Sequence, residues 1–266
     1  MPETRVAFDD ANAYDRYMGR WSRAIGENFL AWLDPPANRS WLDVGCGTGV
    51  FSELILAQAA PDRIIGIDPS PQQVEHATRT VTASQATFRT GSAIDLPFEA
   101  GEFDVVVSAL VIHFIADRPK AFREMLRVAK PGGIVAGYTW RKSPTLLDAP
   151  YGPLARAVKD ITGDVMLSPT VPEAMPEGLR ATLTAESYAD IEIATVEASQ
   201  TFRDFEDYWI SQTGTFQHPV AKSVAAMSDH DRERLREDLR TVLPAAADGS
   251  ITYSARATAF KARKSH

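Results

Sequence analysis

The sequence predicts an α/β protein with a doubly wound, mainly parallel β-sheet. Between residues 40 and 140, short apolar segments alternate with segments of helical pattern, an order that places helices on both faces of a parallel sheet. The first apolar segment runs directly into a glycine-rich turn, which is typical of the ligand-binding edge of such sheets. The length of 266 residues suits one domain with inserts.

The elements of the predicted core, residues 39–140, follow one another in order. Five strands are expected, at residues 41–45, 63–67, 86–90, 103–109 and 133–139. A helix of about residues 50–59 follows the glycines. Another helix begins near Ser70, which can cap it, with Pro71 at its first helical position. A helical lead-in over residues 1–38 is expected before the core.

The remainder of the chain changes character after residue 140. Residues 141–180 carry six prolines, so this segment is expected to form a lid insert without long regular elements. Residues 181–266 are expected to complete the sheet and to carry a helical insert of about residues 202–246. The predicted elements are helices at 179–188, 202–213 and 221–243 and strands at 190–198 and 251–262.

The glycine-rich turn, residues 43–49, indicates which kind of ligand the sheet binds. Glycines let the backbone turn tightly and let a ligand lie against peptide groups. The dinucleotide fingerprint requires a glycine where Val50 stands, and no Gly-Lys-Ser/Thr triplet of a phosphate-binding loop follows. The carboxylate of Asp43 would repel a pyrophosphate and attract a cation. The turn therefore favours a cationic ligand without phosphate.

Five segments resemble, in order and spacing, the motifs of the class I S-adenosylmethionine-dependent methyltransferases. They are residues 43–49, 63–68, 91–98, 103–110 and 126–133. The resemblance covers roughly residues 40–138 and is nearest to the small-molecule enzymes related to ubiquinone and menaquinone biosynthesis. It implies a Rossmann-like sheet of seven strands, the last antiparallel, with helical inserts over the ligand end.

The resemblance also implies S-adenosylmethionine as the cofactor and assigns residues to its parts. The acid and glycines of the first motif, with the carbonyl of Ser108, hold the methionyl portion. The acid after the second strand accepts both ribose hydroxyls, and the third motif surrounds the adenine. The cofactor contacts expected in this way are Asp43, Gly45, Cys46, Gly47, Gly49, Asp68, Pro69, Gln73, Ser92, Ala93, Ile94 and Ser108.

Position 92 departs from the family pattern. The family usually has an aspartate there, which holds the adenine amino group, whereas this chain has Ser92. A hydroxyl still accepts a hydrogen bond but carries no charge. Adenine recognition is therefore expected to rely also on backbone and apolar contacts of Ala93 and Ile94.

The lead-in resembles segments that close over the cofactor in this family. Its candidate cofactor contacts are Tyr17 and Arg20, the guanidinium of Arg20 pairing with the methionyl carboxylate. The alternative is a solvated basic helix face whose aromatic side chains dock the helix.

Candidate groups for the acceptor lie after the fourth strand and in the inserts. His113 stands where the family often carries a pair of histidines, and it is either a general base or a structural residue that fixes the loop. Trp140, Tyr208 and Trp209 are expected to line a pocket for an apolar or planar acceptor, or else to pack the inserts onto the sheet. The spacing of the histidines predicts no metal site.

The resemblance implies a small-molecule acceptor as the partner, and the composition argues against other kinds of partner. A net charge of −7 argues against nucleic acid, whose phosphates draw on clustered cations. No apolar run approaches membrane-spanning length, and no signal peptide is visible. The only cysteine, Cys46, leaves no internal disulfide, so a cytoplasmic location is expected. The sequence leaves open the acceptor, the methylated atom and the oligomeric state.

Two other functions share the expected architecture. A non-catalytic module could keep the cofactor fold for binding alone, and nothing in the sequence excludes it. A nicotinamide-dependent oxidoreductase is the weaker alternative, because both Asp43 and Val50 disfavour a dinucleotide.

Overall fold

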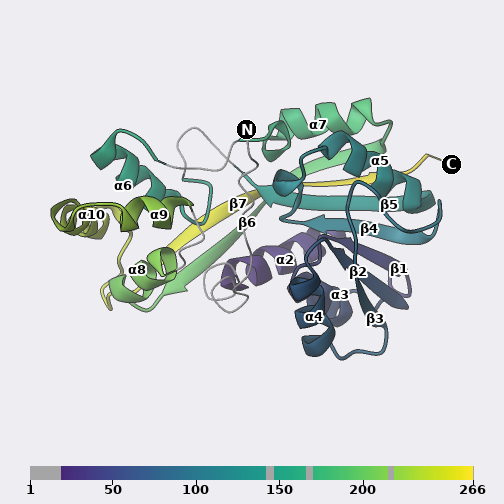
Figure 1. Cartoon of the computed structure of the whole chain (residues 1–266), viewed down its shortest axis with the longest axis horizontal. Coiled ribbons are helices and arrows are strands. Elements are labelled where there is room, and N and C mark those ends of the chain that lie inside the picture. The colour runs from purple at the N-terminus through teal and green to yellow at the C-terminus, as the bar shows by residue number, and fades with distance from the viewer. Residues whose placement is uncertain (1–18, 142–146, 166–169, 215–218, 266) are drawn as a thin grey trace. The chain divides into compact units, whose positions relative to one another are not determined.

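The computed structural model describes residues 19–141, 147–165, 170–214 and 219–265 (Figure 1). They include a seven-stranded sheet in the order β3-β2-β1-β4-β5-β7-β6. The strands are β1 (Ser40–Val44), β2 (Arg63–Asp68), β3 (Ala86–Thr90), β4 (Phe103–Ala109), β5 (Ala129–Trp140), β6 (Ala189–Phe202) and β7 (Ile251–Arg263). Strands β1 to β5 pair in parallel, whereas β7 pairs antiparallel with β5. The predicted sheet with an antiparallel last strand is thus confirmed.

Helices alternate with the parallel strands as the sequence predicts. The helices are α2 (Arg20–Leu33), α3 (Val50–Gln58), α4 (Pro71–Thr80), α5 (Arg118–Val128), α6 (Gly152–Thr162), α7 (Pro176–Ala185), α8 (Phe205–Thr213), α9 (Pro219–Ala225) and α10 (Asp229–Val242), with short 3-10 turns η2 (Ile112–Phe114) and η3 (Pro172–Ala174). The Ser70 hydroxyl caps α4, and Pro71 opens it, both as expected. In the described part of the chain, no helix combines the length and the apolar character needed to cross a membrane.

The chain divides into two compact units. The core unit comprises the described residues within 22–141, 170–197 and 256–266, and the insert unit those within 1–21, 142–169 and 198–255. All five parallel strands belong to the core unit. The insert unit holds α6, α8, α9 and α10.

Helices cover both faces of the parallel sheet in the core unit. Figure 1 shows α3 and α4 on one face and α5 and α7 on the other. Strand β1 is buried along its whole length and β4 nearly so, as expected for central parallel strands. Apolar side chains of the strands and of α5 and α7 meet in one cluster, which includes Leu42, Val106, Phe122, Leu183 and Phe260.

Strand β3 forms one edge of the sheet. It has five residues and pairs with β2. Thr87, Arg89 and Thr90 are exposed along it. The guanidinium carbon of Arg89 lies 4.9 Å from the centroid of the Phe98 ring, so this side chain contacts the loop that follows β3.

Two helical segments differ from the prediction. The proline-rich stretch contains α6, a helix of 11 residues, although the sequence predicts no long regular element there. Pro153 lies in the first turn of α6, where a missing N–H removes no helical hydrogen bond. The helix predicted over residues 221–243 is two helices, because the Ser228 hydroxyl accepts from the amide of Asp231 and starts α10 afresh.

One carboxylate joins the starts of three parallel strands. Oδ2 of Asp104 accepts hydrogen bonds from the Ser40 amide at 3.0 Å, the Ser40 hydroxyl at 2.6 Å and Nζ of Lys130 at 2.9 Å. Partial burial acts to raise the pKa of Asp104, but the hydrogen bonds from Ser40 and Lys130 outweigh it and lower the pKa to about 2. The ionised carboxylate therefore stabilises the amino ends of β1, β4 and β5.

We expect Asp104→Asn to lower the free energy of unfolding at neutral pH by about 1–2 kcal/mol, because a charged acceptor for three donors is lost. The folded pKa lies below the unfolded value of about 3.9. The stabilisation is therefore present above that value and disappears as the pH falls towards 2. Urea unfolding across this range measures it, with the exposed Asp62→Asn as the control. A native-to-variant difference that stays constant down to about pH 2 would contradict the assignment.

Candidate active site

The loop between β1 and α3 is shaped by three glycines. Gly45, Gly47 and Gly49 have positive φ angles of 79°, 54° and 87°, which residues with a Cβ rarely adopt. A Cβ on Gly45 would approach Val111 to 2.5 Å, so this end of the loop is tightly packed. A Cβ on Gly47 would meet only Oε1 of Gln73, at 4.0 Å. The middle of the loop therefore leaves room for a ligand.

Three amides of this loop are hydrogen-bonded to the end of β2. Those of Gly45 and Cys46 both donate to the Ile67 carbonyl, at 2.7 and 3.0 Å. The amide of Gly47 donates to Oδ2 of Asp68 at 3.0 Å. A phosphate-binding loop keeps such amides for its anion. This loop does not, so its geometry disfavours a pyrophosphate ligand.

Asp43 is a buried acid with one oxygen in use. Its Oδ2 accepts from the Ser52 hydroxyl at 2.7 Å, whereas Oδ1 has no hydrogen-bond partner within the described residues. Burial raises the pKa of Asp43 to about 7, the Ser52 hydrogen bond opposes this, and the charge of Asp68 adds to it. A carboxylate in this state favours a cationic partner at Oδ1.

Asp68, the last residue of β2, accepts hydrogen bonds from the glycine loop and from the start of α4. Its Oδ2 accepts from the amide of Gly47, and its Oδ1 accepts from the amide of Ser70 at 2.9 Å. Burial raises the pKa of Asp68, and both amides oppose the shift. Pro69, the next residue, is exposed. Asp68 therefore sets the loop conformation, a role that the sequence does not indicate, beside the ribose contact predicted for it.

The predicted adenine residues lie on α4 and on the loop after β3. Gln73 is buried in α4, and its Oε1 has no partner in the part of the chain described. Ser92, Ala93 and Ile94 are half-buried. The Ser92 hydroxyl accepts from the amide of Ile94 at 3.4 Å. Their contact with adenine stays a prediction.

Two further predicted contacts are buried, Ser108 in β4 and Cys46 in the glycine loop. The hydroxyl of Ser108, in β4, donates to the Val44 carbonyl at 3.0 Å and ties β4 to β1. The thiol of Cys46 is buried, and burial, with the charges of Asp43 and Asp68, raises its pKa well above the usual range. A thiol in this state is a poor nucleophile, so packing beside a ligand is the role that suits Cys46.

His113 is held against the sheet. It lies in η2, directly after β4, and its Nδ1 is 2.8 Å from the hydroxyl of Thr139, a buried residue of β5. This contact orients the ring through one nitrogen. Trp140, next to Thr139, is buried at the end of β5. Roles for His113 and Trp140 in handling the acceptor stay predictions.

The predicted acceptor residues of the insert unit lie in an aromatic cluster on α8. Tyr208 is fully buried, its ring centroid 5.4 Å from that of Phe202. Trp209 stacks on Phe205, with the guanidinium carbon of Arg236 4.8 Å from its ring. The Tyr208 hydroxyl makes no hydrogen bond of normal geometry among the residues described. Packing accounts for both rings, and acceptor binding by them stays a prediction.

The lead-in contributes two predicted cofactor contacts, Tyr17 and Arg20. Tyr17 lies outside the described residues. Arg20 is exposed at the start of α2 and lies 3.6 Å from the carboxylate of Asp207 within the insert unit. This surface pair contributes little stability, and cofactor binding by Arg20 stays a prediction.

Three groups of the site are not among the predicted residues. Ser52, the partner of Asp43, is a polar residue on the apolar helix α3, a pattern that could have marked it. Thr139, the partner of His113, interrupts the apolar end of β5 in the same way. The third group is Glu124 and Arg127 of α5; their spacing of three residues indicates an ion pair, but nothing local indicates their contact with the loop after β3.

Comparisons with known proteins agree with this site. A family model described as a methyltransferase domain matches residues 42–137. A demethylmenaquinone methyltransferase from Symbiobacterium thermophilum is 42% identical over 120 residues, which are 43% of this chain and 47% of that protein. The chain thus spans about half the length of the curated relatives that it matches, 47% and 55% for two of them.

Solved structures share the fold over most of the chain. The YcgJ protein of Bacillus subtilis superposes with a TM-score of 0.58 at 19% identity and covers 91% of this chain and 98% of its own. Phosphoethanolamine N-methyltransferase 2 of Haemonchus contortus, solved with S-adenosyl-L-methionine, has a TM-score of 0.57 at 19% identity, over 96% of this chain and 56% of its own.

The matched segment contains the groups that shape the site. The glycine loop, the acid after β2 and the loop after β3 all fall within residues 42–137. The likeness to the solved structures concerns the fold alone, and it extends beyond this segment. Residues 42–137 therefore match a methyltransferase domain, and over this segment the chain is similar to small-molecule methyltransferases.

Proposed function

We propose that this chain transfers a methyl group from S-adenosylmethionine to a small-molecule acceptor. The observation that carries the proposal is the buried Oδ1 of Asp43, without a partner among the described residues, beside a glycine loop whose amides are in use. Such a site suits a cation without phosphate. The methyltransferase domain over residues 42–137 supports the same cofactor.

The described side chains fit this cofactor. Oδ1 of Asp43 can accept a hydrogen bond from its ammonium group. Each oxygen of Asp68 accepts one hydrogen bond from the loops and retains a second acceptor position for a ribose hydroxyl. Oε1 of Gln73, buried and without a described partner, is a further acceptor near the open space at Gly47.

When bound, S-adenosylmethionine supplies a methyl group that its sulfonium already activates. The tasks left to the chain are to hold both reactants in line and to keep water away from them. No enzyme nucleophile is needed, which agrees with the buried thiol of Cys46. His113, oriented by Thr139, is the candidate to remove a proton from an acceptor that arrives protonated.

We propose an apolar or planar acceptor, such as a quinol. Support comes from the relative in Symbiobacterium thermophilum, which is a demethylmenaquinone methyltransferase. Trp140, Tyr208 and Trp209 are buried and remain the proposed acceptor contacts. A cytoplasmic location without a nucleic-acid partner is part of the proposal, supported by the single cysteine and the net charge of −7.

The two alternative functions find less support. A nicotinamide-dependent oxidoreductase needs a loop that receives a pyrophosphate, and here the loop amides are hydrogen-bonded to the end of β2. A binding module without catalysis would keep the cofactor affinity and lack turnover. Release of S-adenosylhomocysteine in the presence of a hydroquinone acceptor distinguishes this module from an enzyme.

Calorimetry should show binding of S-adenosylhomocysteine and no binding of NAD or NADP. Asp68→Ala should weaken the adenosyl ligand at least tenfold, because a hydrogen bond to a charged group contributes about 1.5–3 kcal/mol. The control is Asp62→Asn, which changes an exposed carboxyl directly before β2. Tight nicotinamide binding without adenosyl-ligand binding would falsify the proposed function.

Asp43→Asn should make the unliganded protein more stable and the cofactor complex weaker. The folded pKa of Asp43, about 7, lies above its unfolded value of about 3.9. The native protein therefore has its full stability below the unfolded pKa of Asp43. It loses stability as the pH rises through the folded pKa, about 7, because the buried carboxyl ionises. At about pH 8 we expect the variant to gain on the order of 2 kcal/mol in urea unfolding.

The same variant should bind S-adenosylhomocysteine at least tenfold more weakly than the native protein, because an amide lacks the charge that attracts the ammonium. Serine at position 52 stays in place, so its hydroxyl still finds an acceptor. A variant that is less stable than the native protein at both about pH 5 and about pH 8 would show that Asp43 is structural.

His113→Gln should lower turnover by about a hundredfold or more if His113 is the general base. Cofactor affinity should stay at the native level, and the pH–rate profile should lose one ionisation. Thr139→Val should shift the same profile to a smaller extent, because it removes only the group that orients the ring. Near-normal turnover of the His113 variant with an unchanged profile would leave this residue with a structural role.

A further inference from the structure

A bidentate ion pair on α5 faces the loop after β3. Glu124 and Arg127 are three residues apart on this helix, with Nε to Oε1 at 2.7 Å and Nη2 to Oε2 at 2.8 Å. The Arg127 side chain is 37% exposed and that of Glu124 17%. Their mutual hydrogen bonds lower the pKa of Glu124 and raise that of Arg127, so both are charged.

The remaining hydrogen-bonding capacity of this pair goes to the backbone of the loop. Oε2 of Glu124 accepts from the amide of Leu96 at 2.8 Å. Arg127 donates from Nη2 to the Leu96 carbonyl at 2.9 Å and from Nη1 to the Phe98 carbonyl at 2.8 Å. Three main-chain groups within three residues are thereby fixed by one ion pair.

The other end of the loop is anchored to β2. The amide of Gly91 donates to the Asp68 carbonyl at 3.0 Å, and the amide of Asp95 donates to the Ser92 carbonyl at 3.1 Å. The turn at residues 92–95, which carries the predicted adenine contacts, thus lies between the β2 anchor and the ion pair. The hydrogen bonds of both anchors are made at Gly91, Leu96 and Phe98, outside residues 92–95.

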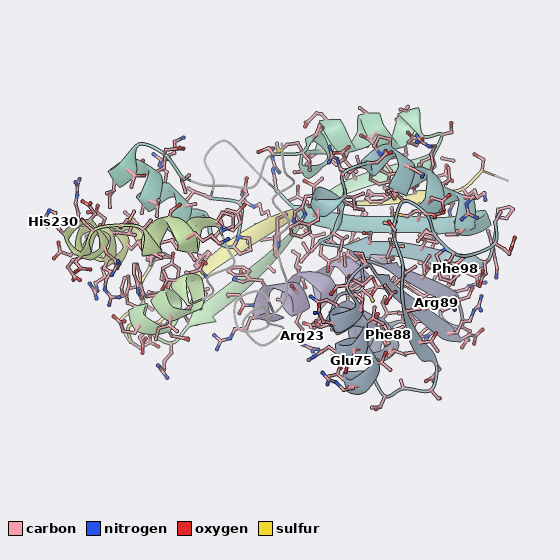
Figure 2. All side chains as sticks on the ribbon, in the orientation of Figure 1. Arg23, Glu75, Phe88, Arg89, Phe98 and His230 are labelled. Atoms are coloured by element: carbon pink, nitrogen blue, oxygen red, sulfur yellow. The ribbon has the colours of Figure 1, made fainter. Side chains whose placement is uncertain are left out.

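The side chain of Phe98 also holds the loop in place. Its ring meets that of Phe103 edge to face, with centroids 5.0 Å apart. The guanidinium of Arg89, on the edge strand, covers the ring as labelled in Figure 2. The segment that the ion pair holds is therefore packed against β3 and β4 and has little freedom to shift.

The chemistry of position 92 makes this rigidity useful. A carboxylate would attract the 6-amino group of adenine over some distance, whereas the Ser92 hydroxyl and main-chain groups discriminate only by where they stand. An error of an ångström in a neutral hydrogen bond forfeits most of its selectivity. The contacts that hold the turn in position therefore determine how selectively it binds the 6-amino group of adenine.

We propose that Glu124 and Arg127 are positioning residues that give the site its preference for adenine over other purines. The inference rests on the proposed function, because it concerns the same cofactor. Without the pair, the turn at residues 92–95 would keep its residues but lose the placement of their donors and acceptors. The base selectivity of the site should then fall, beyond any general loss of affinity.

The test compares two ligands that differ only at the 6-position of the base. S-adenosylhomocysteine carries the amino group, and S-inosylhomocysteine carries an oxo group in its place. Calorimetry gives the ratio of their dissociation constants for the native protein, Arg127→Lys and Glu124→Gln. Arg123→Lys is the matched control, because Arg123 lies on the same helix in an exposed pair with Glu186 at 2.8 Å.

We expect the native protein to favour the adenosyl ligand, and we expect Arg127→Lys to reduce this preference about tenfold, the equivalent of one hydrogen bond to a charged group. Glu124→Gln should reduce it less, since an amide oxygen can still accept from Leu96. Arg123→Lys should leave the ratio unchanged. Circular dichroism and thermal unfolding establish that each variant is folded.

Two results would overturn the inference. A folded Arg127→Lys variant with the native ratio, whether or not both ligands bind more weakly, would give the pair a purely structural role. Failure of both Arg127→Lys and Glu124→Gln to fold while Arg123→Lys folds would do the same. If the native protein binds neither ligand, the proposed function itself fails, which is a different outcome.

Discussion

The main-chain contact between the glycine loop and the end of β2 determines the character of the site. The Ile67 carbonyl accepts hydrogen bonds from two loop amides, and the Asp68 carboxylate accepts one from a third. Three donors that could bind an anion are thereby withdrawn, and the charge left facing a ligand is that of buried carboxyl groups. The same glycine spacing with open amides would suit phosphate. The difference between the two kinds of site lies in these hydrogen bonds, more than in the glycines themselves.

Burial of two acids near one another makes the unliganded site less stable than the site with a cation bound. Asp43 and Asp68 both have raised pKa values, with burial as the larger cause. Buried ionised carboxylates destabilise the unliganded protein, and binding of a cationic ligand offsets this destabilisation. Sites of this kind trade stability for binding. Asp104 offsets part of this cost, because its carboxylate accepts hydrogen bonds at the start of β1, the strand that carries Asp43.

Local sequence pattern was sufficient for the parallel strands, the glycine loop and the Ser70–Pro71 start of α4. Period and turn chemistry act within a few residues, so they can be read directly. The hydrogen bonds of Glu124 and Arg127 to Leu96 and Phe98 join residues about 30 positions apart and have no such signal. The break between α9 and α10 was missed because one capping hydroxyl, that of Ser228, outweighs a continuous helical pattern.

The edge strand β3 bears on how this chain meets other copies of itself. An exposed strand edge is a template on which a second sheet can grow, and long apolar edges lead to fibres. Here the edge is five residues long and carries Arg89 and two exposed threonines. Pairing two such edges would bring cations together and would pull Arg89 away from the Phe98 ring. This short, charged edge is therefore a poor template for strand pairing between copies of the chain.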